Sequence, residues 1–212
     1  MSAGHERSGS DGASVIASYA APTADAETMA GYQAMVVRLR EFLDAVAVAR
    51  PDPEVVAGLE ATLADWSRRL EAAAVPERER LHGRVKRVPG RGNAFVPVFT
   101  MTGRSSDHIE GSVRFGDFHM GTNGVVHGGA VSLVFDDLLG NVAHRGDRRP
   151  SRTAYLHTDF RAPAPINVDL AVRCWLERVE GRKITVRGTL HHGEVLCSEV
   201  EALFVELRPG QV

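Results

Sequence analysis

Two stretches in the first third of the chain carry the period of amphipathic helices. Behind Asp25, and again behind a proline-rich break at 51–53, apolar residues recur every three or four positions. They are Met29, Tyr32, Val36, Leu39, Leu43 and Val46, followed by Val56, Leu59, Leu63, Trp66 and Leu70. Asp52 can cap the second stretch, and Pro53 suits a first helical position. We therefore predict a helical hairpin over residues 25–74.

From about residue 94 the period changes to the alternation typical of strands. Six short segments are rich in β-branched or aromatic residues: 94–102, 107–115, 152–161, 168–179, 183–191 and 194–207. Between the second and third segments the helical period returns, and Val131, Val134, Phe135, Leu138, Leu139 and Val142 fall on one arc. The pattern predicts an α+β domain, with an antiparallel sheet and one apolar helix.

These periods divide the chain into three parts. Residues 1–21 are polar and carry both charge signs, so we expect a disordered tail. Residues 22–89 form the helical hairpin extension and a linker, and residues 90–212 form the sheet domain. Tight turns are predicted at 180–183 and 191–194.

Composition excludes several classes of protein. The 212 residues have a formal net charge of -2, which argues against binding to nucleic acid through bulk charge. The sequence lacks the apolar run of ~18–20 residues that membrane insertion requires. Cys174 and Cys197 lie within predicted strands, which favours buried reduced thiols and a cytoplasmic location. Arginine greatly outnumbers lysine, as in proteins of GC-rich bacterial genomes.

The candidate chemistry lies where the predicted central helix begins. Asn123 opens the sequence NGVVHGG, in which His127 is followed by Gly128 and Gly129. Two glycines at a helix N-terminus offer backbone N–H groups to a carbonyl oxygen that gains negative charge. A tight turn with a capping histidine is the alternative interpretation. Neither a nucleophile-elbow nor a phosphate-loop motif is present, and no cysteine or carboxylate spacing indicates a metal site.

The same helix carries two acids, Asp136 and Asp137. Asp136 lies four residues from both Ser132 and Gly140, small residues that permit close approach, and we favour it as the functional acid. At 1.5 Å per residue it is ~12 Å along the helix from Gly128, beyond the reach of its side chain. Two antiparallel helices from two chains would bring the groups together, so we expect a twofold dimer with shared sites.

The order of these elements, with VVHGGAVSLVFDD leading into the helix and TAYLHTDFRAPAP on the next strand, resembles the PaaI-like hotdog-fold acyl-CoA thioesterases. The resemblance covers about residues 90–208. It implies a sheet wrapped around the helix and a homodimer, with pairing into tetramers left open. It also implies that His127 and Gly128 polarise the thioester carbonyl while Asp136 acts as nucleophile or general base. Coenzyme A enters only as part of the substrate, and no other cofactor is implied.

The resemblance suggests further site residues. Thr153 matches a hydroxyl that holds the attacking water in some members, although Arg152 competes for that position. The supporting asparagine of the family corresponds to Asn123, or has no counterpart here if its position is two residues earlier, where this chain has Gly121. Gly129 would contribute to substrate binding.

A cluster of arginines follows the predicted helix at 145, 148, 149 and 152. From this cluster, Arg149 and Arg152 are candidates for binding the phosphates of coenzyme A. A solvated loop is the alternative interpretation of the cluster.

Two other functions remain open at this stage. A noncatalytic acyl-CoA sensor or scaffold would explain the helical extension, with the helices passing ligand occupancy to a partner. A hotdog hydratase or dehydratase acting on enoyl thioesters is suggested by Gly116 and Asp117, but the asparagine-proline that should follow them is missing.

Overall fold

The computed structural model describes residues 24–85, 88–146, 148–208 and 210–211. The predicted tail at 1–21 lies outside these residues. The chain divides into two compact units, with a boundary between Phe95 and Val96. Within the described residues, no helix combines the length and apolar character needed to cross a bilayer.

The N-terminal unit contains the two predicted helices, α2 (Ala26–Val48) and α3 (Pro53–Ala72). The Asp25 side chain accepts a hydrogen bond from the Thr28 N–H at 2.8 Å. Asp52 accepts one from the Val55 N–H at 2.9 Å, directly before the Pro53 that begins α3. The predicted helix starts are therefore confirmed, because a capping acid at the N-terminus of each helix satisfies a backbone donor that the helix leaves open.

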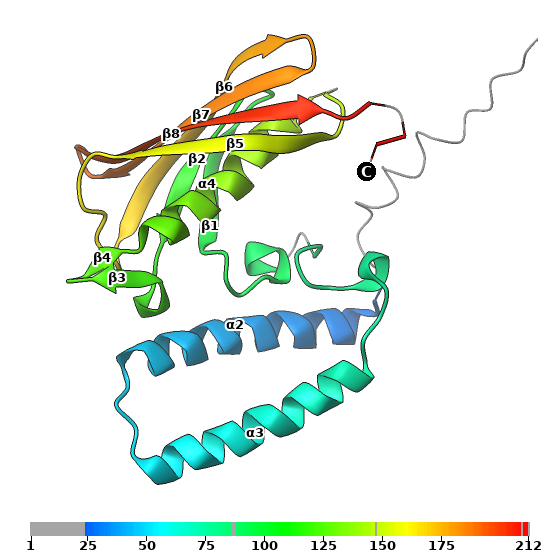
Figure 1. Cartoon of the computed structure of the whole chain (residues 1–212), viewed down its shortest axis with the longest axis vertical. Helices are drawn as coiled ribbons and strands as arrows, with labels where there is room; N and C mark the ends of the chain where they lie inside the picture. The colour runs from blue at the N-terminus through cyan, green and yellow to red at the C-terminus, as the bar shows by residue number, and fades with distance from the viewer. Residues whose placement is uncertain (1–23, 86–87, 147, 209, 212) are drawn as a thin grey trace, which may run out of the picture. The chain divides into compact units, whose positions relative to one another are not determined.

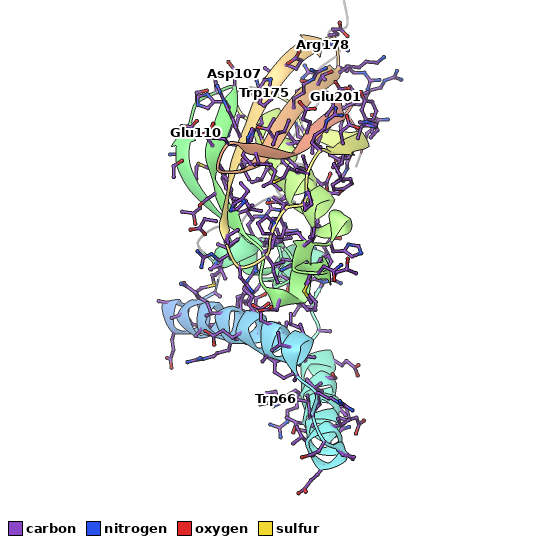
Figure 2. All side chains as sticks on the ribbon, turned by 90° about the vertical axis from the view of Figure 1, so that its left-hand side faces the viewer. Trp66, Asp107, Glu110, Trp175, Arg178 and Glu201 are labelled. Carbon is purple, nitrogen blue, oxygen red and sulfur yellow. The ribbon has the colours of Figure 1, made fainter. Side chains whose placement is uncertain are left out.

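The two helices differ in how they are buried. Val36 of α2 packs with Val85 and Val88, and Arg40 donates to the Asn93 carbonyl at 2.6 Å. No residue of α3 is buried, and Trp66 remains 55% exposed on it (Figure 2). The apolar period of α3 thus predicted the helix correctly, but the apolar residues do not form a buried face.

The C-terminal unit is a six-stranded antiparallel sheet around one helix (Figure 1). Its strands are β1 (Val98–Arg104), β2 (His108–Arg114), β5 (Ser151–Phe160), β6 (Asp169–Glu180), β7 (Lys183–His192) and β8 (Val195–Glu206). They are ordered β1-β2-β6-β7-β8-β5, so β5 is an edge strand. The helix, α4 (Gly128–Ala143), lies against this sheet, which is the hotdog fold expected from the sequence.

Short elements connect these parts. Short 3₁₀ turns lie at η1 (Glu77–Glu79), η2 (Pro89–Gly92) and η3 (Asp117–His119). A small hairpin joins β3 (Met120–Thr122) to β4 (Val125–Val126), and the sequence pattern gave no sign of it. Asn123 and Gly124 form its turn with φ values of 52° and 73°. Asparagine and glycine suit this turn because they tolerate the left-handed conformation.

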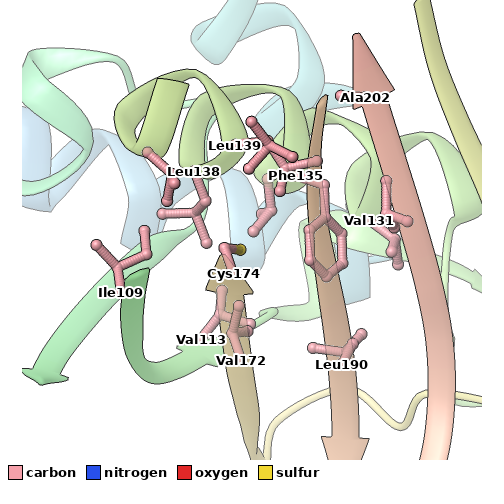
Figure 3. Close-up of a cluster of buried hydrophobic side chains, with 14 of the residues drawn as sticks. Ile109, Val113, Val131, Phe135, Leu138, Leu139, Val172, Cys174, Leu190 and Ala202 are labelled. Carbon is pink, nitrogen blue, oxygen red and sulfur yellow. The ribbon is translucent and has the colours of Figure 1, made fainter. Parts of the chain in front are cut away.

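The core forms where α4 meets the sheet (Figure 3). All six residues of the predicted arc are buried: Val131, Val134, Phe135, Leu138, Leu139 and Val142. Phe135 has no exposed surface, and its ring lies on Gly188 of β7, where a Cβ would be 2.6 Å from a ring carbon. A side chain at Gly188 would push the ring, and the helix with it, away from the sheet.

Both cysteines belong to this core. Cys174 and Cys197 are free and buried, as expected from the strands that carry them. Burial raises the pKa of the Cys174 thiol well above its ordinary value, because a thiolate would lose its hydration there. Cys174 is therefore a packing residue in the folded protein.

The side of the sheet turned away from α4 is polar. Tyr155 and Arg187 both donate to the Glu201 carboxylate at 2.8 Å. These hydrogen bonds, that of Tyr155 first, hold the pKa of Glu201 below its ordinary value. Trp175, Arg178 and Glu201 project from the strands of this region in Figure 2.

Phe135→Ala should lower the free energy of unfolding by about 3–5 kcal/mol, because it opens a cavity between α4 and β7. Urea denaturation would measure the loss. Val179→Ala, at a side chain that is 48% exposed on β6, is the control and should stay within about 0.5 kcal/mol of the wild type. Equal effects of the two substitutions would contradict the assignment of Phe135 to the core.

Candidate active site

His127 caps the N-terminus of α4. The ring Nδ1 of His127 accepts a hydrogen bond from the Gly129 N–H at 3.0 Å, and the backbone N–H of His127 donates to the His119 carbonyl at 2.8 Å. Because Nδ1 is an acceptor, the neutral ring carries its proton on Nε2. The exposed imidazole can therefore donate a hydrogen bond from Nε2 to a bound carbonyl oxygen.

Gly128 supplies the open donor at this helix end. Within the described part of the chain no group accepts from its N–H, whereas the Gly129 N–H is occupied by His127. The sequence suggested two available glycine N–H groups, and the structure leaves one. A Cβ at Gly128 would be 2.9 Å from the Phe160 ring, so a larger residue here would displace that exposed ring. A free N–H at the positive end of a helix suits a developing oxyanion.

Asp136 lies on the exposed side of α4, where it meets β5. The Thr153 hydroxyl donates to Asp136 Oδ1 at 3.1 Å. One turn toward the N-terminus of the helix, Ser132 and Thr158 pair at 3.3 Å. The structure thus brings together two of the predicted residues, the carboxylate and the threonine that sequence comparison left uncertain.

The predicted residues fall into two separate groups within one chain. His127 and Gly128 are at the start of α4, and Asp136 with Thr153 is eight residues further along the helix, roughly 12 Å at 1.5 Å per residue. The side chain of Asp136 cannot span that distance. Within one chain, the N–H donor and the carboxylate therefore cannot act on the same carbonyl.

The remaining predicted residues lie elsewhere. Asn123 is at the tip of the β3–β4 turn, which accounts for its identity by backbone conformation alone. Ser151 and Thr153 both contact groups of α4 or its C-cap, so Arg152 between them points to the opposite face of β5. Arg149 is exposed in the loop before β5.

The two other arginines of the predicted cluster, Arg145 and Arg148, bind groups at the C-terminal end of α4. Arg148 donates to the carbonyls of Ala143 at 3.0 Å and Val142 at 2.8 Å. Arg145 donates to the Asn141 side chain at 3.0 Å. Cations at a helix C-terminus satisfy its open carbonyls and interact favourably with its dipole.

Sequence reasoning missed Phe160 and Thr158, which line the same junction of α4 and β5 as Thr153. Strand alternation could have found them, since every second residue of a strand shares a face. A bulge between Thr153 and Tyr155 adds one residue and shifts that alternation. Counting backwards from Phe160 would therefore have placed Thr153 on the wrong face.

Comparisons with known proteins agree with this architecture. Residues 123–198 match the family model described as the thioesterase superfamily, and this segment contains all the predicted site residues. Over these residues the hotdog domain is similar to the thioesterase superfamily.

Curated relatives and a solved structure extend the comparison. Acyl-coenzyme A thioesterase THEM4 of Mus musculus is 33% identical over 97 residues, which are 44% of this chain and 41% of that protein. The Rattus norvegicus protein of the same name is 33% identical over 99 residues, 45% and 42% of the two chains. This chain spans less than half the length of these relatives.

The crystal structure of thioesterase superfamily protein RHA08564 is similar to this chain with a TM-score of 0.71 and 28% identity. The similarity covers 88% of this chain and 94% of that one. Such coverage exceeds the C-terminal unit, so RHA08564 also has a counterpart to part of the N-terminal helical unit.

His127→Ala should lower the free energy of unfolding by about 1 kcal/mol, because it removes the acceptor of the Gly129 N–H. His127→Asn should retain most of that stability, since asparagine is a favourable N-cap. Urea denaturation of both variants tests the cap, and an alanine variant as stable as the wild type would contradict it.

Proposed function

We propose that this protein is an acyl-CoA thioesterase that hydrolyses an acyl-CoA to the free acid and coenzyme A. The observation that carries the proposal is the exposed face of α4, with a free N–H at one end and a carboxylate paired with a hydroxyl further along. An electrophilic carbonyl needs both kinds of group. The curated relatives are named acyl-coenzyme A thioesterases, which supports the choice of substrate.

The thioester oxygen would accept hydrogen bonds from the Gly128 N–H and from Nε2 of His127. Negative charge that develops on this oxygen is stabilised by these donors and by the positive end of α4. The Asp136 carboxylate attacks the carbonyl carbon, or accepts a proton from the water that attacks it. The C–S bond then breaks, and coenzyme A leaves as the thiol after taking up a proton from water or from the protonated carboxyl group. Where Asp136 itself attacks, the acyl group stays on its carboxylate as an anhydride, which water then hydrolyses to the free acid and the original Asp136.

Thr153 would position the acid or the water. Its hydroxyl donates to one oxygen of Asp136, which holds the carboxylate and leaves its second oxygen for the reaction. All the proposed steps use groups of the protein and water. Arg149, in its exposed loop, would contact the phosphates of coenzyme A.

Each site would be completed by a second copy of this chain. Two α4 helices in antiparallel contact around a twofold axis would bring the partner's Asp136 to His127 and Gly128. The exposure of Asp136 and the edge position of β5 beside it support such a contact. A strand edge presents unpaired backbone groups, which a second copy can satisfy.

Asp136→Asn should lower the turnover of acyl-CoA by about 10²–10⁴-fold, the usual contribution of a catalytic base. Release of coenzyme A can be followed with a thiol reagent, because both cysteines of the chain are buried and should react slowly. Circular dichroism and size-exclusion chromatography would show that the variant keeps its fold and assembly.

Asp137→Asn is the matched control, because it makes the same change one residue away on α4. Its turnover should stay within about threefold of the wild type once corrected for the folded fraction. Equal losses in both variants, or full activity of Asp136→Asn, would contradict the assigned role. A wild-type protein that binds acyl-CoA without releasing thiol would contradict the proposed reaction itself.

A further inference from the structure

Phe160 is a large aromatic side chain that the proposed reaction does not use. It ends β5 and is 58% exposed, although it lies on the strand face turned toward α4. Its ring meets the backbone of Gly128, where the nearest ring carbon is 2.9 Å from the position of a Cβ. An exposed phenyl ring beside an open backbone donor indicates an apolar surface kept for a ligand.

Three pairs of residues line the junction of α4 and β5, and their polarity changes along it. Asp136 with Thr153 forms the polar end, Ser132 with Thr158 follows, and Gly128 with Phe160 forms the last pair. The Gly128 and Phe160 pair is the only one of the three without a side-chain oxygen. An apolar part of a substrate therefore fits best at the end that holds Phe160.

The position of the ring limits the space next to the bound carbonyl. A carbonyl oxygen that accepts from the Gly128 N–H lies about 2.9 Å from that nitrogen, so its carbon is within about 4 Å. The nearest carbon of the ring is 2.9 Å from where a Cβ of residue 128 would stand, so the ring fills the space directly beside this residue. The first carbons of the acyl group must then pass against the ring.

We propose that Phe160 determines acyl specificity by forming the wall against which carbons 2 and 3 of the acyl group pack. This inference rests on the proposed function, and it names the favoured class of substrate. Straight-chain acyl-CoAs fit beside the ring, whereas a branch at carbon 2 collides with it. Phe160 limits the space available to the acyl group and takes no part in bond breaking.

Hydrolysis of butanoyl-CoA and 2-methylpropanoyl-CoA compares two acyl groups of equal carbon number. Phe160→Ala should raise the ratio of kcat/KM for the branched over the straight substrate by on the order of tenfold or more, the scale on which an apolar pocket discriminates one methyl group. Phe160→Leu should give a smaller rise, and it provides the test if the alanine variant fails to fold. Phe160→Tyr keeps the ring and should leave the ratio unchanged.

Tyr155→Ala is the matched control, because Tyr155 is a partly exposed aromatic of the same strand that bonds to Glu201 on the other face. The ratio of kcat/KM for the branched over the straight substrate should be the same in Tyr155→Ala as in the wild type. An unchanged ratio in Phe160→Ala would overturn the inference. So would an equal rise in KM for both substrates, which would place the ring against the coenzyme A moiety.

Binding separates this inference from the proposed reaction. Calorimetry with the same two acyl-CoAs in the Asp136→Asn background, with and without Phe160→Ala, should show preference for the straight chain only when Phe160 is present. If the wild-type protein hydrolyses neither substrate, that binding result would support the role of Phe160 and contradict the thioesterase activity. Failure to bind either acyl-CoA would contradict both.

Discussion

The rise of the α-helix is the constraint on which the candidate site depends. α4 is one regular helix of 16 residues, and it carries an open backbone N–H at its start and a carboxylate eight residues later. The separation of ~12 Å is too large for one carbonyl to meet both within a chain. The same helix is buried along the opposite arc, so the sheet fixes which face is left open. Core packing thereby leaves open the face of α4 on which the proposed shared site depends.

A phenylalanine ring packs against a glycine both in the core and at the candidate site. Phe135 lies on Gly188 inside the core, and Phe160 lies on Gly128 at the surface. In both, the missing side chain lets a ring approach the backbone closely. The buried contact holds α4 to the sheet, whereas the exposed contact leaves a ring face and an N–H available together.

The sequence predicted those features that depend on neighbours along the chain. Capping by Asp52, the buried arc of α4 and the two short turns after β6 and β7 all follow from local pattern, and the structure has each of them. Local pattern also identified Asp136, because a carboxylate beside an apolar arc stands out. Each of these features depends only on residues that are close together in the sequence.

Features that depend on distant neighbours could not be predicted in this way. The period of α3 indicates an apolar face but not whether anything covers it. The length of the loop before β5 left Arg152 and Thr153 hard to separate, and the contacts of Ser151 and Thr153 with α4 and its C-cap distinguish them. Similarly, the sequence cannot show that His127 occupies the Gly129 N–H, since this requires the rotamer of the ring.

The central claim is that two chains complete each site, and subunit complementation tests it most directly. His127→Asn and Asp136→Asn chains with different tags would be unfolded together, refolded and assayed for release of coenzyme A. Random pairing makes half of the dimers mixed, each with one intact site, so activity should recover to about a quarter of the wild type. Mixed dimers that form but remain as inactive as either variant alone would contradict the claim.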